Sequence, residues 1–129
     1  MTSSRADRER QTLGARRRLR RKQDFETVYA AGRRFGNGFF GVTAHRNDKD
    51  GPRLGLAVSL RVAGTAVERN RLRRIIRESF RLRQHELPPV DVVVSVRPRA
   101  KGAANAELRA SLDALWDKVR NQCARLPSG

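Results

Sequence analysis

One segment of sixteen residues, 66–81, constrains the fold of this chain more than any other. Read at 3.6 residues per turn, it places apolar or small side chains along one side, which predicts a helix packed against a core. These side chains are Leu72, Ile75, Ile76, Ser79 and Phe80. A second stripe, offset toward solvent, consists of Asn70, Arg73, Arg74, Arg77 and Arg81. A stripe of one charge sign is typical of a surface that binds a polyanion, whereas a solvated helix face usually mixes both signs.

The sequence also indicates where this helix begins. Thr65 and Glu68 match the S/T-x-x-E capping box, in which each side chain accepts a hydrogen bond from the other residue's backbone N–H. Arg69 and Arg71 then lie in the first turns, where an exposed positive charge opposes the helix dipole by roughly 0.3–1 kcal/mol each. Because both arginines disfavour the helix start, we expect these positions to serve binding rather than stability.

The composition points to a polyphosphate partner. The 129 residues include 29 lysines and arginines against 13 acidic residues, for a formal net charge of +16 and a pI of about 11.8. Such a charge attracts and holds a nucleic acid. Arginine supplies nearly all of it, and guanidinium suits RNA because it binds phosphate bidentately and stacks on bases. A GC-rich genome would produce the same arginine bias, so this preference alone does not decide the cause.

Other classes of function have little support in the sequence. No apolar run approaches the ~18–20 residues that span a bilayer, and the N-terminus lacks the apolar core of a secretory signal, so we expect a cytoplasmic protein without a membrane partner. The single cysteine, Cys123, excludes an internal disulfide and a cysteine-based zinc site. His45 and His85 form no pair, and the aspartates are scattered, so we expect no catalytic side chain and no protein metal site. The arginine-rich helix also lacks the broad apolar face of membrane-surface helices.

The remaining pattern predicts one folded domain over residues 21–123, preceded by a disordered basic arm over 1–20 and followed by a tail over 124–129. We expect helices from Lys22 to a C-cap at Gly32, over 66–86 and after Ala104, and strands over 39–44, 54–60 and 90–96. The first two strands read as a hairpin-like pair. The last two flank the arginine-rich helix and read as parallel neighbours, which the general rule for such units would connect with right-handed chirality. These elements predict an α+β fold, a two-layer α/β sandwich.

Several of these segments, in this order, resemble the protein component of bacterial ribonuclease P. The centre of the match is 66–81, which resembles the family's Arg-Asn-Arg signature followed by a basic pair and Arg-Glu. The other landmarks are Leu19 through Asp24-Phe25 with Val28-Tyr29, the segment 53–59, and Asp91-Val92-Val93-Val94 followed by Arg97. The resemblance covers roughly residues 18–120, and the long signature in this context is far more specific than a bare Arg-Asn-Arg.

The resemblance implies a fold and a role. The implied fold is an α+β sandwich in the order αβββαβα with a left-handed crossover, in place of the right-handed one that the general rule predicts. The implied role is that of a protein subunit that helps a catalytic RNA subunit to remove the 5′ leader from precursor tRNA by endonucleolytic cleavage. Magnesium would be bound mainly by RNA, and no obligate protein partner is expected. A general RNA-binding or ribosomal protein is the alternative, which the charge alone would equally allow.

The resemblance also implies which residues bind RNA. The signature residues that would face the RNA subunit are Arg69, Asn70, Arg71, Arg73, Arg74 and Arg77. Phe25 and Tyr29 fall on aromatic positions of a cleft between the first helix and the sheet that would hold the single-stranded leader, although their spacing alone would indicate core packing. Arg61 stands where many relatives have a second lysine. A sheet aromatic of the family is Val42 here, and Phe40, on the same strand face, is a candidate substitute.

Overall fold

A four-stranded sheet in the order β1-β2-β4-β3 organises residues 14–123, the part of the chain that this computed structural model describes. The strands are β1 (Arg33–Gly36), β2 (Phe40–Arg46), β3 (Arg53–Ala57) and β4 (Val90–Val96). The α-helices are α2 (Lys22–Ala31), α3 (Leu60–Ala63), α4 (Ala66–Arg83) and α5 (Asn105–Cys123), and the short 3-10 turns are η1 (Ala15–Arg17), η2 (Gln84–Glu86) and η3 (Pro98–Ala100). The order of helices and strands agrees with the predicted αβββαβα, with α3 as a short addition.

Strand β4 lies in the interior of the sheet. It pairs antiparallel with β2 and parallel with β3, so the predicted parallel pairing across the arginine-rich helix is confirmed. The predicted hairpin-like pairing of 39–44 with 54–60 is wrong, because β4 lies between these two strands. The reason is the valine run of β4, which is buried on both faces. Because water is excluded there, the backbone N–H and C=O groups on both edges of β4 need a partner strand.

The segment before β2 forms a strand of its own, β1. β1 pairs antiparallel with β2, and Phe35 lies opposite Val42. Asn37 stabilises the connection, because its side-chain oxygen accepts hydrogen bonds from the backbone N–H groups of Phe39 and Phe40 at 2.9 and 3.0 Å. The predicted strand over 54–60 ends at Ala57, because Ser59 caps α3 by accepting a hydrogen bond from Val62 N–H.

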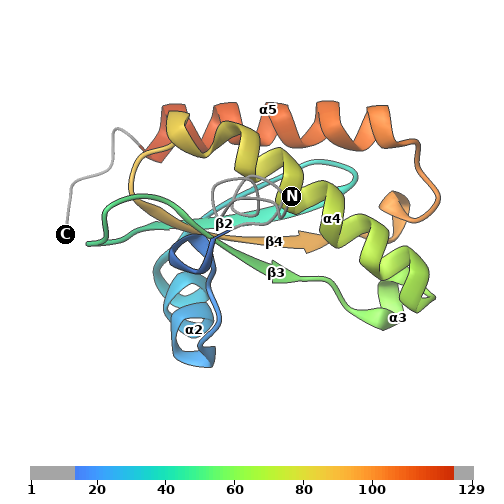
Figure 1. The fold of residues 1–129 in the computed structure, drawn as a ribbon, viewed down its shortest axis with the longest axis horizontal. Helices are drawn as coiled ribbons and strands as arrows, with labels where there is room; N and C mark the ends of the chain where they lie inside the picture. The colour runs from blue at the N-terminus through green and yellow to red at the C-terminus, as the bar shows by residue number, and fades with distance from the viewer. Residues whose placement is uncertain (1–13, 124–129) are drawn as a thin grey trace, which may run out of the picture.

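The helices divide between the two faces of the sheet. Figure 1 shows α4 and α5 on one face and α2 on the other. The sheet with α4 and α5 forms the predicted two-layer sandwich, whose core includes Phe80 and Trp116 with ring centroids 5.6 Å apart. The buried Trp116 indole N–H donates to the Ser79 hydroxyl at 2.7 Å. On the α2 face, Leu19, Val28 and Val93 form a second, smaller buried cluster.

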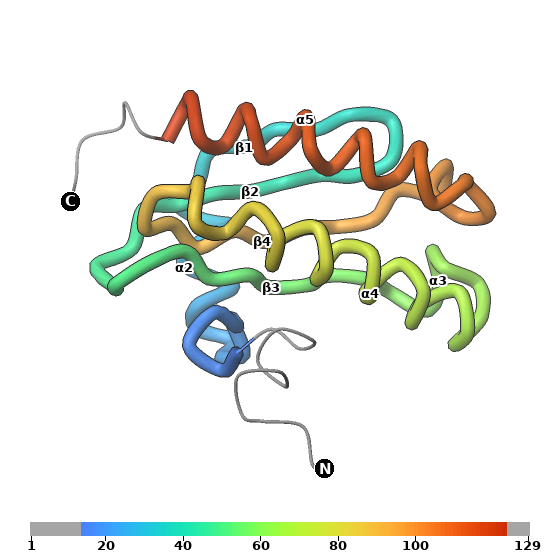
Figure 2. Tube along the Cα trace, turned by 45° about the horizontal axis from the view of Figure 1, so that its top comes forward, coloured from blue at the N-terminus to red at the C-terminus, as the bar shows by residue number. Residues whose placement is uncertain are grey.

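The crossover from β3 to β4 is left-handed. In Figure 2 the helices α4 and α5 face the viewer, and β3 and β4 both run from left to right. The chain leaves β3, returns through α4 over the near face of the sheet and enters β4 above β3 in this view, which makes the turn left-handed. The handedness that the family resemblance implies is thus confirmed, and the general preference for right-handed crossovers does not hold here.

Only half of the predicted capping box forms at the start of α4. The Thr65 hydroxyl accepts a hydrogen bond from Glu68 N–H at 3.1 Å, as predicted. The Glu68 carboxylate does not return to Thr65 but accepts bonds from Arg71 Nε and Nη2, both at 2.7 Å, and from Gly102 N–H at 2.8 Å. The hydrogen bonds of Arg71, with smaller contributions from Gly102 and from nearby charge, lower the pKa of Glu68 to about 2.

The last part of the predicted disordered arm is ordered against the sheet. Leu19 is 5% exposed, and its N–H donates to the Leu54 carbonyl at 2.8 Å, while Arg18 forms a parallel bridge with Leu54 beside β3. The prediction of disorder is therefore wrong for 14–20. Residues 1–13 and the predicted tail lie outside the described part. No helix within the described range is both long enough and apolar enough to cross a membrane.

We expect Glu68→Gln to lower the free energy of unfolding at pH 7 by about 1.5 kcal/mol. This value is at the lower end of the range for hydrogen bonds to a charged group, because Glu68 is partly exposed. The pKa of Glu68 is lower in the folded protein than its ordinary value of 4.5, so its ionised form favours folding. This contribution is complete above about pH 5 and disappears as the pH falls toward 2. Urea unfolding of both proteins between pH 7 and pH 2 measures the difference.

The difference between the two proteins isolates Glu68, because other titrating groups are common to both. Asp50, for example, also has a lowered pKa, through hydrogen bonds from Arg16 and Arg17, and its effect cancels in the subtraction. A stability difference that stays constant from pH 7 to pH 2 would contradict the assignment of the charged carboxylate as the stabilising form.

Candidate nucleic-acid interface

Arginines in this structure fall into two groups, those paired with carboxylates and those without such a partner. The paired group lies mainly at the sheet end and along α5. Its members include Arg16, Arg17, Arg53, Arg71, Arg83, Arg109 and Arg120. Within residues 14–123, no ion pair is formed by Arg61 or by the arginines at positions 73, 74, 77 and 81. The α3–α4 region therefore holds a local excess of positive charge that the fold does not neutralise.

The predicted stripe on α4 divides into three directions. Asn70 and Arg74 are exposed on the outer side of the helix. Arg73 and Arg77 are half-buried and point toward β3, where they line a depression. Arg81 lines a different depression on the α5 side, together with Arg109. The structure therefore brings Arg73 and Arg77 together with each other but separates both from Arg81.

Arg69 and Arg71 hold the ends of neighbouring segments in place. Arg69 Nε donates to the Val58 carbonyl at 2.8 Å, which ties α4 to the end of β3. Arg71 binds Glu68 and donates through Nη1 to Asn105 Oδ1 at 2.6 Å, which ties α4 to the start of α5. Both arginines therefore stabilise the fold, which the sequence-based prediction had excluded. Their role in binding stays a prediction. Both side chains are half-buried.

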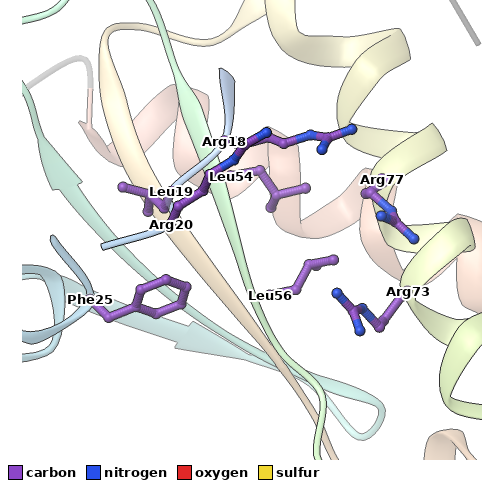
Figure 3. Close-up of a pocket in the computed structure, with 8 residues that line it drawn as sticks. All are labelled: Arg18, Leu19, Arg20, Phe25, Leu54, Leu56, Arg73 and Arg77. Atoms are coloured by element: carbon purple, nitrogen blue, oxygen red, sulfur yellow. The ribbon is translucent and has the colours of Figure 1, made fainter. Parts of the chain in front are cut away.

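Arg73 and Arg77 belong to a depression of about 310 Å³ at the outer edge of β3, which we call the arginine pocket. Its lining consists of Arg18, Leu19, Arg20, Phe25, Leu54, Leu56, Arg73 and Arg77. Figure 3 shows Leu54 and Leu56 in the middle, with Phe25 on one side and the two α4 arginines on the other. Burial lowers the pKa of Arg77, and the positive charges of Arg73, Arg18 and Arg74 lower it further. This crowding of like charges favours an anion.

Phe25 and Tyr29 occupy successive turns of α2 but differ in surroundings. Phe25 is half-buried against the Leu19–Val28–Val93 cluster, and its ring lies over Gly55, where an added Cβ would come within 2.7 Å of Phe25 Cζ. Tyr29 is 42% exposed, and partial burial raises the pKa of its hydroxyl. The core packing that the helical spacing predicts for both rings is thus partly confirmed for Phe25. The ring of Tyr29 is accessible instead.

The predicted contact of Phe40 with RNA is corrected. Phe40 has an exposed fraction of 0% and lies with Val42 in the core beneath α4 and α5, on the face away from α2. Side chains alternate along a strand, so Thr43 takes the α2-facing position and lies opposite Val93. Neither Phe40 nor Val42 can therefore provide an aromatic surface in the α2 cleft.

Sequence reasoning missed three arginines of this region. Arg18 and Arg20 fall in the segment that the sequence predicts to be disordered. The only indication that this segment packs against the sheet is the apolar side chain of Leu19 between them. Arg97 had been noted as a landmark but not as a binding residue. Its guanidinium lies over Gly36, where an added Cβ would come within 2.6 Å of Nη2. Because Gly36 and Gly41 lie opposite each other on β1 and β2, these two glycines were the signal for a close approach.

Acidic side chains near the site have structural partners. Asp91 is 7% exposed and accepts hydrogen bonds from Arg53 Nε and Nη2 at 2.8 and 2.6 Å and from Asn47 Nδ2 at 2.8 Å. The bonds to Asp91 raise the pKa of Arg53. Across residues 14–123, no three histidine, cysteine, aspartate or glutamate side chains come together as metal ligands.

The chain is similar to known proteins over most of its length. A family model described as Ribonuclease P matches residues 13–120. The ribonuclease P protein component of Halorhodospira halophila is 47% identical over 106 residues, which cover 81% of this chain and 87% of that protein. That of Thioalkalivibrio sulfidiphilus is 41% identical over 107 residues, which cover 83% and 89%. The solved RNase P protein of Staphylococcus aureus superimposes with a TM-score of 0.73 at 31% identity, covering 84% of this chain and 95% of that one.

These similarities span the strands, the arginine-rich helix and the arginine pocket together, and they agree with the resemblance carried by the signature. They do not favour a general RNA-binding or ribosomal protein. The chain belongs to the ribonuclease P protein family, whose members act with an RNA subunit as the protein subunit of the endoribonuclease that matures tRNA 5′ ends.

Proposed function

We propose that the exposed side of the α3–α4 region binds the ribonuclease P RNA subunit. The observation that carries this proposal is the contrast between paired and unpaired arginines. Arg61 and Arg74 are exposed and make no ion pair within residues 14–123, although the chain contains carboxylates that neutralise other arginines. Unneutralised guanidiniums on a rigid helix can bind the phosphates of a folded RNA and release its counterions. Asn70 adds an exposed amide between them.

We further propose that the cleft between α2 and the sheet binds the single-stranded 5′ leader of precursor tRNA. Tyr29 offers an accessible ring on one side, and Phe25 lies one turn before it. Thr43 and Gly41 lie on the α2-facing side of β2, and the Arg97 guanidinium lies over Gly36. Aromatic rings beside guanidiniums suit unpaired nucleotides, because bases stack on the rings while phosphates meet the positive charge.

The protein's contribution to cleavage in this proposal is electrostatic and positional. Magnesium ions would be held mainly by the RNA. The net charge of +16 offsets the repulsion between two large RNAs and lowers the magnesium concentration needed to bring them together. Residues 21–123, joined by the ordered segment 14–20, would form this single RNA-binding domain, acting in the cytoplasm where precursor tRNA is processed.

We expect cleavage of precursor tRNA at low magnesium to require both subunits. The experiment compares purified protein alone, bacterial ribonuclease P RNA alone and the reconstituted mixture, with the 5′ end of the product mapped. Correct 5′ cleavage in the mixture and not in either component supports the proposal. Absence of stimulation by a folded protein with a matched RNA subunit would favour a general RNA binder, and cleavage by the protein alone would reveal an active site in it.

We expect Arg61→Glu with Arg74→Glu to weaken binding of the RNA subunit by more than tenfold at moderate salt. Each lost phosphate contact removes a slope of roughly 0.7–0.9 from the dependence of log K on log salt, so the slope should fall by about 2. Filter binding or fluorescence anisotropy across a salt series measures both quantities.

The matched control is Arg109→Glu with Lys118→Glu, which makes the same change in net charge on the exposed side of α5. A general effect of charge would weaken both double variants equally, and that result would refute an RNA interface centred on α3 and α4. Circular dichroism and urea unfolding of each variant establish that the fold is retained.

We expect Tyr29→Ala to reduce the preference of the holoenzyme for precursor over mature tRNA by about tenfold. Stacking of one base on an aromatic ring contributes roughly 1–3 kcal/mol, and only the precursor carries the leader that would use this ring. Equilibrium binding of both tRNAs to the holoenzyme measures the preference.

Two variants on the same helix serve as controls for this experiment. Tyr29→Phe keeps the ring and should keep most of the preference, whereas Thr27→Ala alters an exposed side chain of α2 without removing a ring. Equal losses for precursor and mature tRNA with Tyr29→Ala would mean that the ring does not contact the leader.

A further inference from the structure

The arginine pocket lies where the two proposed RNA surfaces approach each other around the outer edge of β3. Its positive side chains come from two distant segments, Arg18 and Arg20 beside β3 and Arg73 and Arg77 on α4. The hydrogen bond from Leu19 N–H to the Leu54 carbonyl fixes the first segment along the strand. Figure 3 shows the Arg18 side chain extending toward α4, so that its guanidinium approaches the side on which Arg77 lies. The pocket is therefore enclosed by charge on two sides.

These four guanidiniums lack the partners that neutralise other arginines. Within residues 14–123, none of them forms an ion pair, and the Nε donors of Arg18 and Arg73 are buried without a hydrogen bond. A buried donor without an acceptor is costly, and like charges held close together repel. The lowered pKa of Arg77, caused by burial and then by its positive neighbours, reflects the same crowding. A bound phosphate would supply acceptors and offset this repulsion.

The middle and the opposite side of the pocket are apolar. Leu54 and Leu56 lie between the guanidiniums and the ring of Phe25. The volume of about 310 Å³ falls at the lower end of the roughly 300–1,000 Å³ typical of small-molecule sites. A flat aromatic group beside an anion fits such a lining, and a single nucleotide has this composition. A continuous duplex does not fit, because its bases are paired and stacked within the helix.

We propose that the arginine pocket binds one unpaired nucleotide of the 5′ leader, with its phosphate held by Arg18, Arg20, Arg73 and Arg77 and its base against Phe25 and Leu56. This inference rests on the proposed binding of the leader in the α2 cleft. The leader is the favoured source because Phe25 borders both the cleft and the pocket, so a strand that follows α2 reaches the pocket around β3. Arg18 and Arg20 thereby become specificity-determining residues for precursor over mature tRNA. Arg73 and Arg77, which the family resemblance assigns to the RNA subunit, are assigned to the leader in this proposal.

The test combines a protein variant with a chemically altered leader. In Arg18→Gln with Arg20→Gln, both side chains stay polar, and the backbone bond of Leu19 is retained. Precursor tRNAs carry one uncharged methylphosphonate linkage at successive leader positions. With the unaltered holoenzyme, we expect one linkage to weaken precursor binding by about tenfold. With the variant holoenzyme, precursor binding is already about tenfold weaker, and the same linkage has no further effect. Affinities for mature tRNA and for the RNA subunit stay unchanged.

Controls separate pocket binding from general electrostatics and from misfolding. Arg109→Gln with Lys118→Gln removes the same charge from α5 and should retain the response to the linkage. Arg77→Gln, on the α4 side of the pocket, should lose the response at the same linkage, so the result does not depend on the first segment alone. Urea unfolding of each variant confirms that the domain is folded.

Three outcomes would overturn the inference. A loss equal to that of the α5 control would mean that only net charge matters. A loss of affinity for the RNA subunit would assign the pocket to that RNA. An unaltered response to the linkage would place the phosphate elsewhere. If Tyr29→Ala still reduces the preference for precursor tRNA in these cases, the leader binds beside α2 but not in the arginine pocket. If Tyr29→Ala also has no effect, the proposal that the leader binds beside α2 is itself wrong.

Discussion

The parallel pairing of β3 with β4 is the contact on which the rest of this structure depends. Parallel neighbours must be joined by a crossover, and here the crossover contains the arginine-rich helix α4. Because β3 is the edge strand, Arg73 and Arg77 of α4 lie near the edge of the sheet, beside Leu54 and Leu56 of β3. The same edge receives the segment 18–20 on its open side. One pairing therefore sets the position of α4, the exposure of its basic side and the location of the arginine pocket.

Carboxylates neutralise only part of the positive charge within residues 14–123. Carboxylates neutralise the arginines that would otherwise repel one another around the sheet end and α5, such as Arg53 through Asp91 and Arg83 through Asp117. Within residues 14–123, no ion pair is formed by Arg61 of α3, by Arg18 and Arg20 beside β3, or by the α4 arginines at positions 73, 74, 77 and 81, whereas Arg71 and Arg83 of α4 are paired. Leaving the unpaired arginines unneutralised costs stability through self-repulsion, and in the proposed complex the phosphates of RNA would offset that cost.

Local patterns predicted much of this structure, and long-range contacts account for most of what they missed. The periodicity of α4 identified its buried side, because Leu72, Ile76 and Phe80 follow one another within a few turns. The valine run likewise identified β4. Which strands flank β4 depends on contacts far apart in sequence, so the pairing of 39–44 with 54–60 was wrong. The same limit hid Arg18 and Arg20, whose order depends on Leu54. The prediction for Phe40 was wrong because the sequence does not show which side chains of β2 face α2. That side follows only from the pairing of β2 with β4 and from the positions of the helices.

The arginine signature combines two tasks that sequence analysis treated as alternatives. Arg69 and Arg71 flank Asn70 and reach in opposite directions, one to Val58 and the other to Glu68 and Asn105. These bonds join the first turn of α4 to the end of β3 and to the start of α5. Asn70 lies between these two arginines, so its exposed amide has little freedom to move relative to the sheet. A preorganised surface of this kind binds with a smaller loss of conformational entropy. The charges that disfavour the helix dipole thus also fix the geometry of the surface that is proposed to bind RNA.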